Sequence, residues 1–359
     1  MNMSTMSYWL DSARDPTVRH TAFAIARDRY AWPNVILVVA ILAFYAGGIA
    51  LLATVHSPVA IVLAIALLSQ SMIWSWYLVH DCAHQLVSKR RLVNVCLGEM
   101  LSLINGVAYA PFESYRLDHL RHHSGKIDLL GTDLGEIAKR WPRMVTCILL
   151  TLEALYIPVF FYVIKWRTVM ECIVVGTFGE RLRVAGCLAV YGALFHLLLS
   201  ASAAALAALF AASFVRIHVA RFVDTFQHSY DQIDPAVPGD KVRTREYELH
   251  NTFSLPVARK WVALNSLILN FGFHCAHRVV PSCPWYALPK LDRLLHQASG
   301  ADHQYGARET GVSFLDLLRS YHRNRVDRIF DTNEGNPYDQ DGCFSLREFT
   351  GAYTDKLLG

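Results

Sequence analysis

Charged side chains are scarce in this sequence of 359 residues. Asp, Glu, Lys and Arg together make up 18% of it and hydrophobic residues make up 53%, whereas an ordinary soluble protein has about a quarter charged residues. The shortage is concentrated in long apolar runs, which indicates a membrane protein rather than a soluble protein with a large core. The net charge of +4 is modest and gives no indication of a nucleic-acid partner.

Paired cysteines are also lacking. The eight cysteines are scattered, and no two of them form a CxxC pair, which argues against a zinc site or a dense disulfide framework. We therefore expect a reducing, cytosolic environment. The early apolar stretch of a secretory signal is missing as well. The first apolar run starts near Asn34, after Arg14, Arg19, Arg27 and Arg29, so we expect a retained, cytoplasmic N-terminus.

Long apolar runs, by contrast, are abundant. About 20 apolar residues in a helix cross a bilayer of roughly 30 Å. Four such helices are predicted, at approximately 34–55, 58–79, 184–200 and 203–220. The last two divide one charge-free segment near Ser200–Ser202. In the alternative, this segment is a single long fourth span and residues 145–164 form the third. Both alternatives return the C-terminal part to the cytoplasm.

The segments outside these spans are predicted to form a cytoplasmic cap. Residues 80–183 carry many Lys and Arg side chains, which mark the cytoplasmic side of a membrane protein. We assign residues 80–183 and 221–359 to the cap, in which the apolar stretches 92–110 and 145–164 are interfacial or re-entrant helices. The predicted fold class is an all-α integral membrane protein, with four transmembrane helices and a cytoplasmic helical cap, in a single domain over residues 1–359.

Histidines give the strongest functional signal. The segment HDCAH (80–84) has two histidines four apart, HLRHH (119–123) gives spacings of three and four, and HCAHR (274–278) gives a spacing of three. Side chains at these spacings share one face of a helix. A further histidine, in DTFQHSYD, follows the last span. All four groups lie near predicted membrane ends on the cytoplasmic side, so they are able to converge.

Convergence of these groups predicts a metal site. A single pair of histidines at helical spacing is more often incidental. Three such segments in order along the chain, with a fourth histidine and a four-span layout, are poorly explained by chance. Neutral imidazole is a good ligand for iron. Oxidation of an unactivated C–H bond is chemistry that side chains alone do not perform, so a metal has to carry it.

The same segments carry a resemblance to a known family. VHDCAHQLV, FESYRLDHLRHHSGKID, FVDTFQHSYD and LNFGFHCAHRVVPSCPWYALPKL resemble the membrane fatty acid desaturase and hydroxylase superfamily, over roughly His80 to Leu291. The resemblance implies a histidine-bound centre of two non-haem iron ions, O2 as co-substrate and an external electron donor. The ligands it implies are His80, His84, His119, His122, His123, His228, His274 and His277.

The third histidine box departs from the family pattern. The family usually has HxxHH, and the last position here is Arg278, which cannot bind a metal because it is permanently protonated. Three explanations remain open. The site is active with one ligand fewer; or His250, Glu246 or Glu248 substitutes; or the chain is a degenerate member that binds iron poorly. We favour an active site.

Polar residues near the histidines are candidates for orienting the rings, because a metal-bound histidine usually donates its other N–H to a carboxylate or carbonyl. The candidates are Asp81, Asp118, Asp224 and Gln227, and Asn270 matches an asparagine that the family often has before the third box. A helix through Asp224 and His228 would put both on one face. An ordinary surface or capping role is the alternative for each.

A second, weaker metal signal lies near the C-terminus. Within Asp331–Phe349, the segment DQDGCFSLREF resembles the later part of an EF-hand loop, and its side chains fall at ligand offsets. The residues at the matching offsets are Asp339, Asp341, Gly342, Ser345 and Glu348. The first ligand position is Pro337, which has no side-chain ligand, so we interpret the segment as part of the soluble cap.

The predicted reaction is O2-dependent oxidation of a fatty-acyl chain. Desaturation ranks first, oxidative decarboxylation to a terminal alkene second and hydroxylation third, because one ligand set supports all three. Neither a haem domain nor a ferredoxin-like cysteine set is found, so we expect a separate donor: a ferredoxin, a rubredoxin or a cytochrome b5-like protein, with its reductase. Lys89, Arg90 and Arg91 would dock an acidic donor or anionic lipid headgroups. The non-enzyme alternative is a degenerate chain that binds lipid or a partner.

Overall fold

The computed structural model describes residues 16–55, 57–126, 128–129, 138–230, 232–233, 244, 247–248, 251–299 and 313–329. The chain divides into two compact units. The membrane unit comprises residues 31–117, 136–221 and 355–359, and the histidine unit comprises residues 1–30, 118–135 and 222–354. The chain passes from one unit to the other inside two continuous helices, α6 and α11.

Four helices of the membrane unit are long and apolar enough to cross a bilayer. They are α3 (Ala31–Thr54), α4 (Pro58–Ala83), α10 (Phe178–Ala201) and α11 (Ala203–Thr225), the last four residues of which belong to the histidine unit. The four predicted spans, and with them the helical membrane fold class, are confirmed. Both α4 and α11 continue further along the chain than the apolar runs do. The buried ion pair between Arg221 and Glu153, 3.1 Å apart, allows α11 to carry a charge beyond its apolar part.

The break between the third and fourth spans lies where the sequence predicts it. Ser202 has an extended backbone (φ −171°, ψ 155°), and its hydroxyl accepts a hydrogen bond from the N–H of Ala205 at 3.0 Å. Such an oxygen satisfies an amide that the first helical turn leaves open. The alternative with a single long fourth span is therefore wrong. The break between α3 and α4 has the same form, since Ser57 accepts from Ala60 and Pro58 occupies the first helical position.

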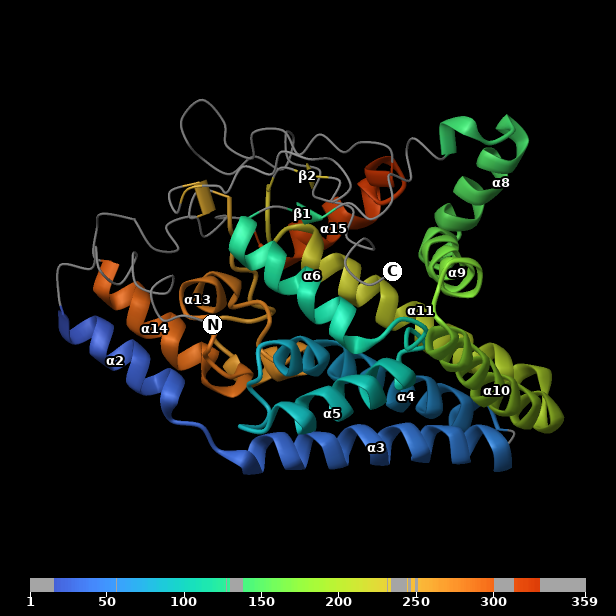
Figure 1. Cartoon of the computed structure of the whole chain (residues 1–359), viewed down its shortest axis with the longest axis horizontal. Coiled ribbons are helices and arrows are strands. Elements are labelled where there is room, and N and C mark those ends of the chain that lie inside the picture. The colour runs from blue at the N-terminus through green and yellow to red at the C-terminus, as the bar shows by residue number, and fades with distance from the viewer. Residues whose placement is uncertain are drawn as a thin grey trace. The chain divides into compact units, whose positions relative to one another are not determined.

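Shorter helices complete the membrane unit. They are α5 (Arg91–Ile104), α8 (Arg143–Ala154) and α9 (Val159–Val174), and α6 (Phe112–Gly125) begins in this unit. The α8 and α9 axes meet at 118°, and Pro158, which has no N–H to continue a helix, stands at this bend. The α3, α4 and α5 helices lie side by side (Figure 1). Leu68 and Ala212 are fully buried in an apolar core formed by α3, α4, α10 and α11.

The histidine unit consists of short helices, two short strands and irregular segments. Its helices are α2 (Pro16–Arg27), the end of α6, α13 (His274–Val279), α14 (Leu288–Ser299) and α15 (Phe314–Asn324), with 3-10 turns η2 (Val262–Ile268), η3 (Trp285–Ala287) and η5 (Asp327–Ile329). Strand β1 (Asp128–Leu129) pairs in parallel with β2 (Gln232–Ile233). Helices α2 and α14 pack side by side (Figure 1). Their buried core includes Ala22, Ala276 and Leu291, so α13 is held against the pair.

Candidate metal centre

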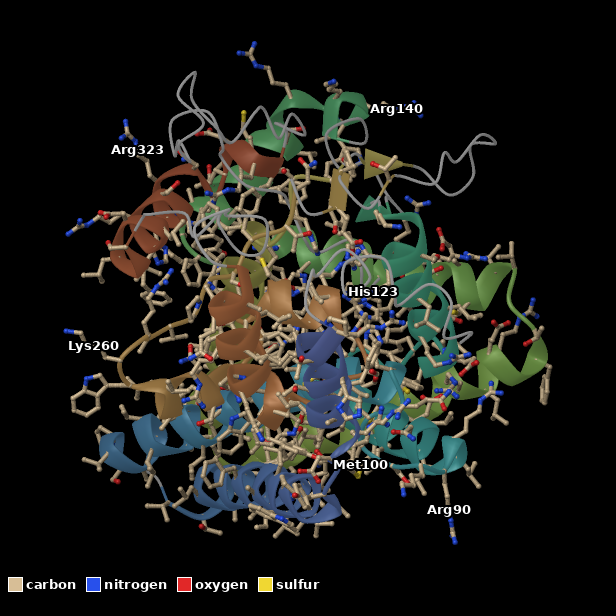
Figure 2. All side chains as sticks on the ribbon, turned by 90° about the vertical axis from the view of Figure 1, so that its left-hand side faces the viewer. Arg90, Met100, His123, Arg140, Lys260 and Arg323 are labelled. Carbon is tan, nitrogen blue, oxygen red and sulfur yellow. The ribbon has the colours of Figure 1, made fainter. Side chains whose placement is uncertain are left out.

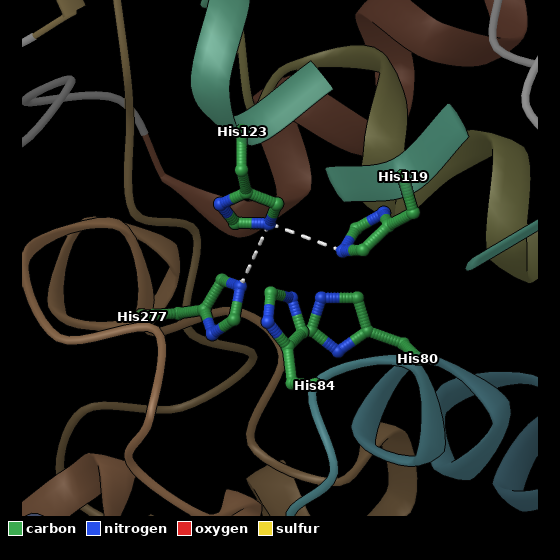
Figure 3. Close-up of side chains that lie close together, drawn as sticks. All are labelled: His80, His84, His119, His123 and His277. Atoms are coloured by element: carbon green, nitrogen blue, oxygen red, sulfur yellow. Dashed lines mark hydrogen bonds between the residues drawn. The ribbon is translucent and has the colours of Figure 1, made fainter. Parts of the chain in front are cut away.

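Three predicted histidines of the histidine unit form a first group. His119 and His123 lie one turn apart on α6, and His277 comes from α13. The Nε2 atom of His123 is 3.0 Å from Nε2 of His119 and 3.3 Å from Nε2 of His277. Figure 3 shows the three rings turned toward one another, with these two contacts dashed. A ring nitrogen of each lies within 4.8 Å of the others.

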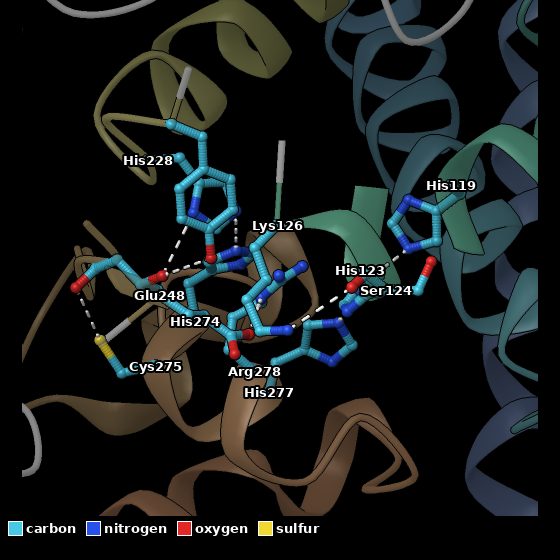
Figure 4. A network of polar contacts seen from close by, with 12 residues as sticks. His119, His123, Ser124, Lys126, His228, Glu248, His274, Cys275, His277 and Arg278 are labelled. Carbon is cyan, nitrogen blue, oxygen red and sulfur yellow. Dashed lines mark hydrogen bonds and ion pairs between the residues drawn. The ribbon is translucent and has the colours of Figure 1, made fainter. Parts of the chain in front are cut away.

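A second group of three adjoins the first within the same unit. His122 lies on α6, His228 follows the end of α11, and His274 begins α13. The Nε2 atoms of His228 and His274 are 2.8 Å apart, and the ring centroids of His122 and His228 are 4.9 Å apart. Figure 4 shows His228 and His274 together, beside the polar contacts that surround them. Helix α6 therefore contributes to both groups, as does α13.

The protein interior surrounds all six rings. Each of the six histidines is less than a tenth exposed, whereas Lys260 and Arg323 of the same unit point outward (Figure 2). Burial, followed by the neighbouring His274, His122 and Arg278, lowers the pKa of His228 well below its ordinary value. A neutral imidazole keeps a lone pair available for a metal. His228 is therefore suited to act as a neutral nitrogen ligand.

The spacing of the nitrogens fits a metal better than hydrogen bonds alone. A neutral ring nitrogen offers one proton or one lone pair, so Nε2 of His123 makes one straight hydrogen bond and not two. A cation would accept a lone pair from all three rings of its group. Metal–nitrogen bonds of about 2.1 Å place two ligand nitrogens about 3.0–3.4 Å apart. The 3.0 and 3.3 Å separations in the first group lie in this range.

The remaining two predicted ligands belong to the membrane unit. His80 lies in the last turn of α4, and His84 follows the end of that helix. Their ring centroids are 4.7 Å apart, and both side chains are drawn in Figure 3. Nδ1 of His80 is 3.3 Å from Oδ1 of Asp81, an orienting contact of the kind predicted for this carboxylate.

Arg278 forms a buried ion pair with a carboxylate. Its Nε donates to Oε1 of Glu248 at 2.9 Å, with both side chains almost fully buried. Its guanidinium also lies over the ring of Tyr230, 5.3 Å from the centroid. Glu248, one of the proposed substitute ligands, thus pairs with the arginine. The other two, Glu246 and His250, lie outside the described residues, as does the EF-hand-like segment.

The other predicted orienting residues have varied positions. Asp118 pairs with Arg121 at the surface, 3.1 Å away. The side chain of Gln227 donates to the carbonyl of Phe271 at 3.5 Å, and that of Asn270 donates to the carbonyl of Trp285 at 3.0 Å. Helix α11 ends at Thr225, so Asp224 and His228 do not share a helical face as expected.

Two residues beside His228 were missed from the sequence. Oγ1 of Thr252 lies 3.4 Å from Nδ1 of His228 and hydrogen-bonds with the hydroxyl of Tyr230 at 2.8 Å. The Tyr230 ring stacks on that of His228 with centroids 4.1 Å apart. Tyr230 stands two positions after the histidine, which is the only sequence signal for it. Thr252 is 24 positions away, and no pattern in the sequence connects it with the histidine.

The fold and this geometry define a class of protein: a helical membrane protein with a buried, histidine-rich site suited to metal. Comparison with family models places the chain more narrowly. The model of the fatty acid desaturase family matches residues 55–309, a stretch that contains all eight predicted ligands. The chain belongs to the fatty acid desaturase family. A comparison with curated proteins gave no match.

Proposed function

We propose that this protein is an O2-dependent di-iron oxidase that introduces a C=C bond into a fatty-acyl chain. The observation that carries the proposal is the arrangement of six buried imidazoles in two groups of three, in a member of the fatty acid desaturase family. Two such groups suit two metal ions, and imidazole nitrogen is a ligand that iron accepts.

The proposed ligand set has eight members. The first group would hold one ion and the second group the other, with His80 and His84 completing the centre. The reason to include these two is their spacing at the end of α4 and the family match, which runs through all four histidine segments. Bound iron would supply the O2 chemistry that side chains lack.

The protein's own groups would set the protonation and the orientation of these rings. The hydroxyl of Thr252 stands at Nδ1 of His228, which leaves Nε2 with its lone pair toward the site, and the carboxylate of Asp81 does the same for His80. Such contacts fix the tautomer of a ligating histidine. Oxidation balances when O2 takes two electrons and two protons from the substrate, two electrons from a donor and two protons from solvent, and forms two molecules of water.

The donor is proposed to be a separate protein, such as a ferredoxin, a rubredoxin or a cytochrome b5-like protein with its reductase. We propose that it meets the cytoplasmic face, where both termini and the histidine site would also lie. Lys89 and Arg90 are exposed and would attract an acidic partner. Arg91 is less available, because it pairs with Glu113 at 2.8 Å.

The rival candidate is a degenerate, non-catalytic member of the family. Its support in the sequence was Arg278. The ion pair of Arg278 with Glu248 gives this arginine a structural role beside His228, so it does not require an abandoned metal site. Decarboxylation and hydroxylation would use the same ligands, and the product separates them from desaturation.

The test measures iron per chain in the detergent-purified protein, together with the lipids of the expressing cells. Wild type is compared with His122→Ala and with His20→Ala, which removes an exposed histidine from α2. We expect about two iron ions per chain in wild type and in His20→Ala. His122→Ala should lose most of this iron, together with a new unsaturated acyl product.

Each other outcome has a definite meaning. Negligible iron in wild type, with unchanged lipids, would contradict the oxidase and favour the lipid- or partner-binding rival. If the product is a shortened terminal alkene or a hydroxylated acid, the proposal of an iron centre stands. The reaction is then decarboxylation or hydroxylation and not desaturation.

A further inference from the structure

A cavity of about 400 Å³ lies within the membrane unit, apart from the histidines. It is bounded by side chains of α3, α4, α9, α10 and α11 and by the connection between α5 and α6. Its volume is in the range of small-molecule sites, about 300–1,000 Å³. Most of its wall is apolar or aromatic, and no Asp or Glu lines it in the described part of the chain.

Lys165, on α9, contributes a positively charged side chain to the wall of this cavity. Its Nζ lies among three tyrosine rings, 5.3 Å from the centroid of Tyr109, 5.5 Å from that of Tyr162 and 5.9 Å from that of Tyr191. Some arginines of the same unit pair with carboxylates, such as Arg183 with Glu99 at 2.6 Å. Cation–π contacts with these rings offset part of the cost of removing the Lys165 charge from water.

The surroundings of Lys165 disfavour its charge. The Lys165 side chain is partly buried, and the positive charge of Arg216 is close enough to act on it. Arg216 is buried and donates to the carbonyl of Asn105 at 3.3 Å. Lys165 therefore stands in an apolar cavity wall that contains no carboxylate among the described residues. An anion that entered the cavity would supply its counter-charge.

We propose that this cavity binds an unesterified long-chain fatty acid, with its carboxylate at Lys165 and its alkyl chain along the apolar wall. The proposal rests on the proposed acyl-chain oxidation and names the form of its substrate. A thioester or a methyl ester has the same chain but no carboxylate to pair with the ammonium. Such a charge-assisted contact is stronger than a hydrogen bond between neutral groups.

The position of the cavity suits a substrate site. Met72 contributes to its wall, and His80 follows eight residues later on the same helix. At 1.5 Å per residue these two positions are about 12 Å apart along α4. Met72 therefore places part of the cavity wall on the helix that carries His80.

The test measures equilibrium binding of radiolabelled palmitate and of methyl palmitate to the full-length protein in nanodiscs. We expect wild type to bind palmitate about tenfold more tightly than the ester, the factor that one buried charge contact gives. Lys165→Met should remove this preference, and Lys165→Arg should retain most of it. Arg167→Met is the matched control, because Arg167 is an exposed cation on the same helix, paired with Glu171. It should bind both probes as wild type does.

Several results would overturn the proposal. Equal affinity of wild type for the acid and the ester would do so without any variant. Unchanged selectivity in Lys165→Met would do so as well. Displacement of palmitate by phosphatidylglycerol at lower concentration than by unlabelled palmitate would assign the cavity to a phospholipid headgroup instead.

The same assay with His122→Ala separates this inference from the proposed function. Palmitate selectivity that persists in a protein without iron or product would uphold the fatty-acid site while the oxidase fails. Loss of selectivity in wild type that retains iron and makes product would overturn the fatty-acid site and leave the oxidase in place.

Discussion

At the scale of single residues, the Arg278–Glu248 pair decides how the third histidine box is interpreted. The arginine is next to His277 in sequence, yet its guanidinium contacts Glu248 and the ring of Tyr230. Tyr230 in turn stacks on His228. The arginine therefore supports the wall behind a histidine, and its charge is one of the factors that keep His228 neutral.

Glu248→Gln tests this interpretation. The substitution leaves the buried Arg278 without its counter-charge, and breaking a buried pair typically costs about 3–5 kcal/mol. We expect a clear fall in the thermal unfolding temperature of the detergent-purified protein. The double variant Glu248→Gln, Arg278→Met should recover most of the loss, because it removes the unpaired charge as well.

Glu171→Gln serves as the control for this prediction. It breaks the exposed pair with Arg167, and an exposed pair contributes about 0–1 kcal/mol, so the unfolding temperature should hardly change. An unfolding temperature of Glu248→Gln equal to that of wild type would show that the buried pair does not stabilise this region.

At the scale of secondary structure, close packing between α5 and the start of α6 sets where the histidine-bearing helix begins. A Cβ atom on Gly98 would lie 2.5 Å from the Phe112 ring. The N–H of Phe112 also donates to the carboxylate of Glu99 at 3.1 Å. Phe112 is the first residue of α6, so a shift of its ring displaces the start of that helix.

Gly98→Ala is therefore expected to destabilise the protein by about 1–3 kcal/mol, the usual cost of overpacking. We also expect less iron per chain, since α6 carries three of the proposed ligands. Gly186→Ala is the control, because nothing lies within 4 Å of the added methyl and alanine favours a helix over glycine. If Gly98→Ala matches Gly186→Ala in stability and iron, the close packing does not position α6.

Several features of the helices could be predicted from the sequence. The four spans follow from local composition, and the breaks at Ser202 and Pro158 follow from local chemistry. The spacing of His119, His122 and His123 correctly indicates a helix. The two groups were not predictable, because His122 contacts His228, which contacts His274, whereas His123 contacts His277. These pairings depend on long-range packing, as does the contact of Arg278 with a carboxylate 30 positions away.

At the scale of the whole molecule, the eight proposed ligands are spread along the chain from His80 to His277. His80 and His84 belong to the membrane unit, and the other six histidines belong to the histidine unit. An ion bound by ligands from both would bind only to the fully folded chain. Binding of that kind stabilises the folded state by RT ln(1 + [metal]/Kd), or about 2.7 kcal/mol at one hundred times Kd.

Iron removal is therefore expected to lower the thermal unfolding temperature of the wild-type protein, and added ferrous iron should restore it. His20→Ala should respond in the same way as wild type. The double variant His80→Ala, His84→Ala should lose most of this response although the six histidines of the other unit remain, because each ion needs its full set of ligands to bind tightly. If the double variant kept both the iron and the restored stability, these two histidines would lie outside the centre. The eight-ligand proposal would then reduce to the two groups of three.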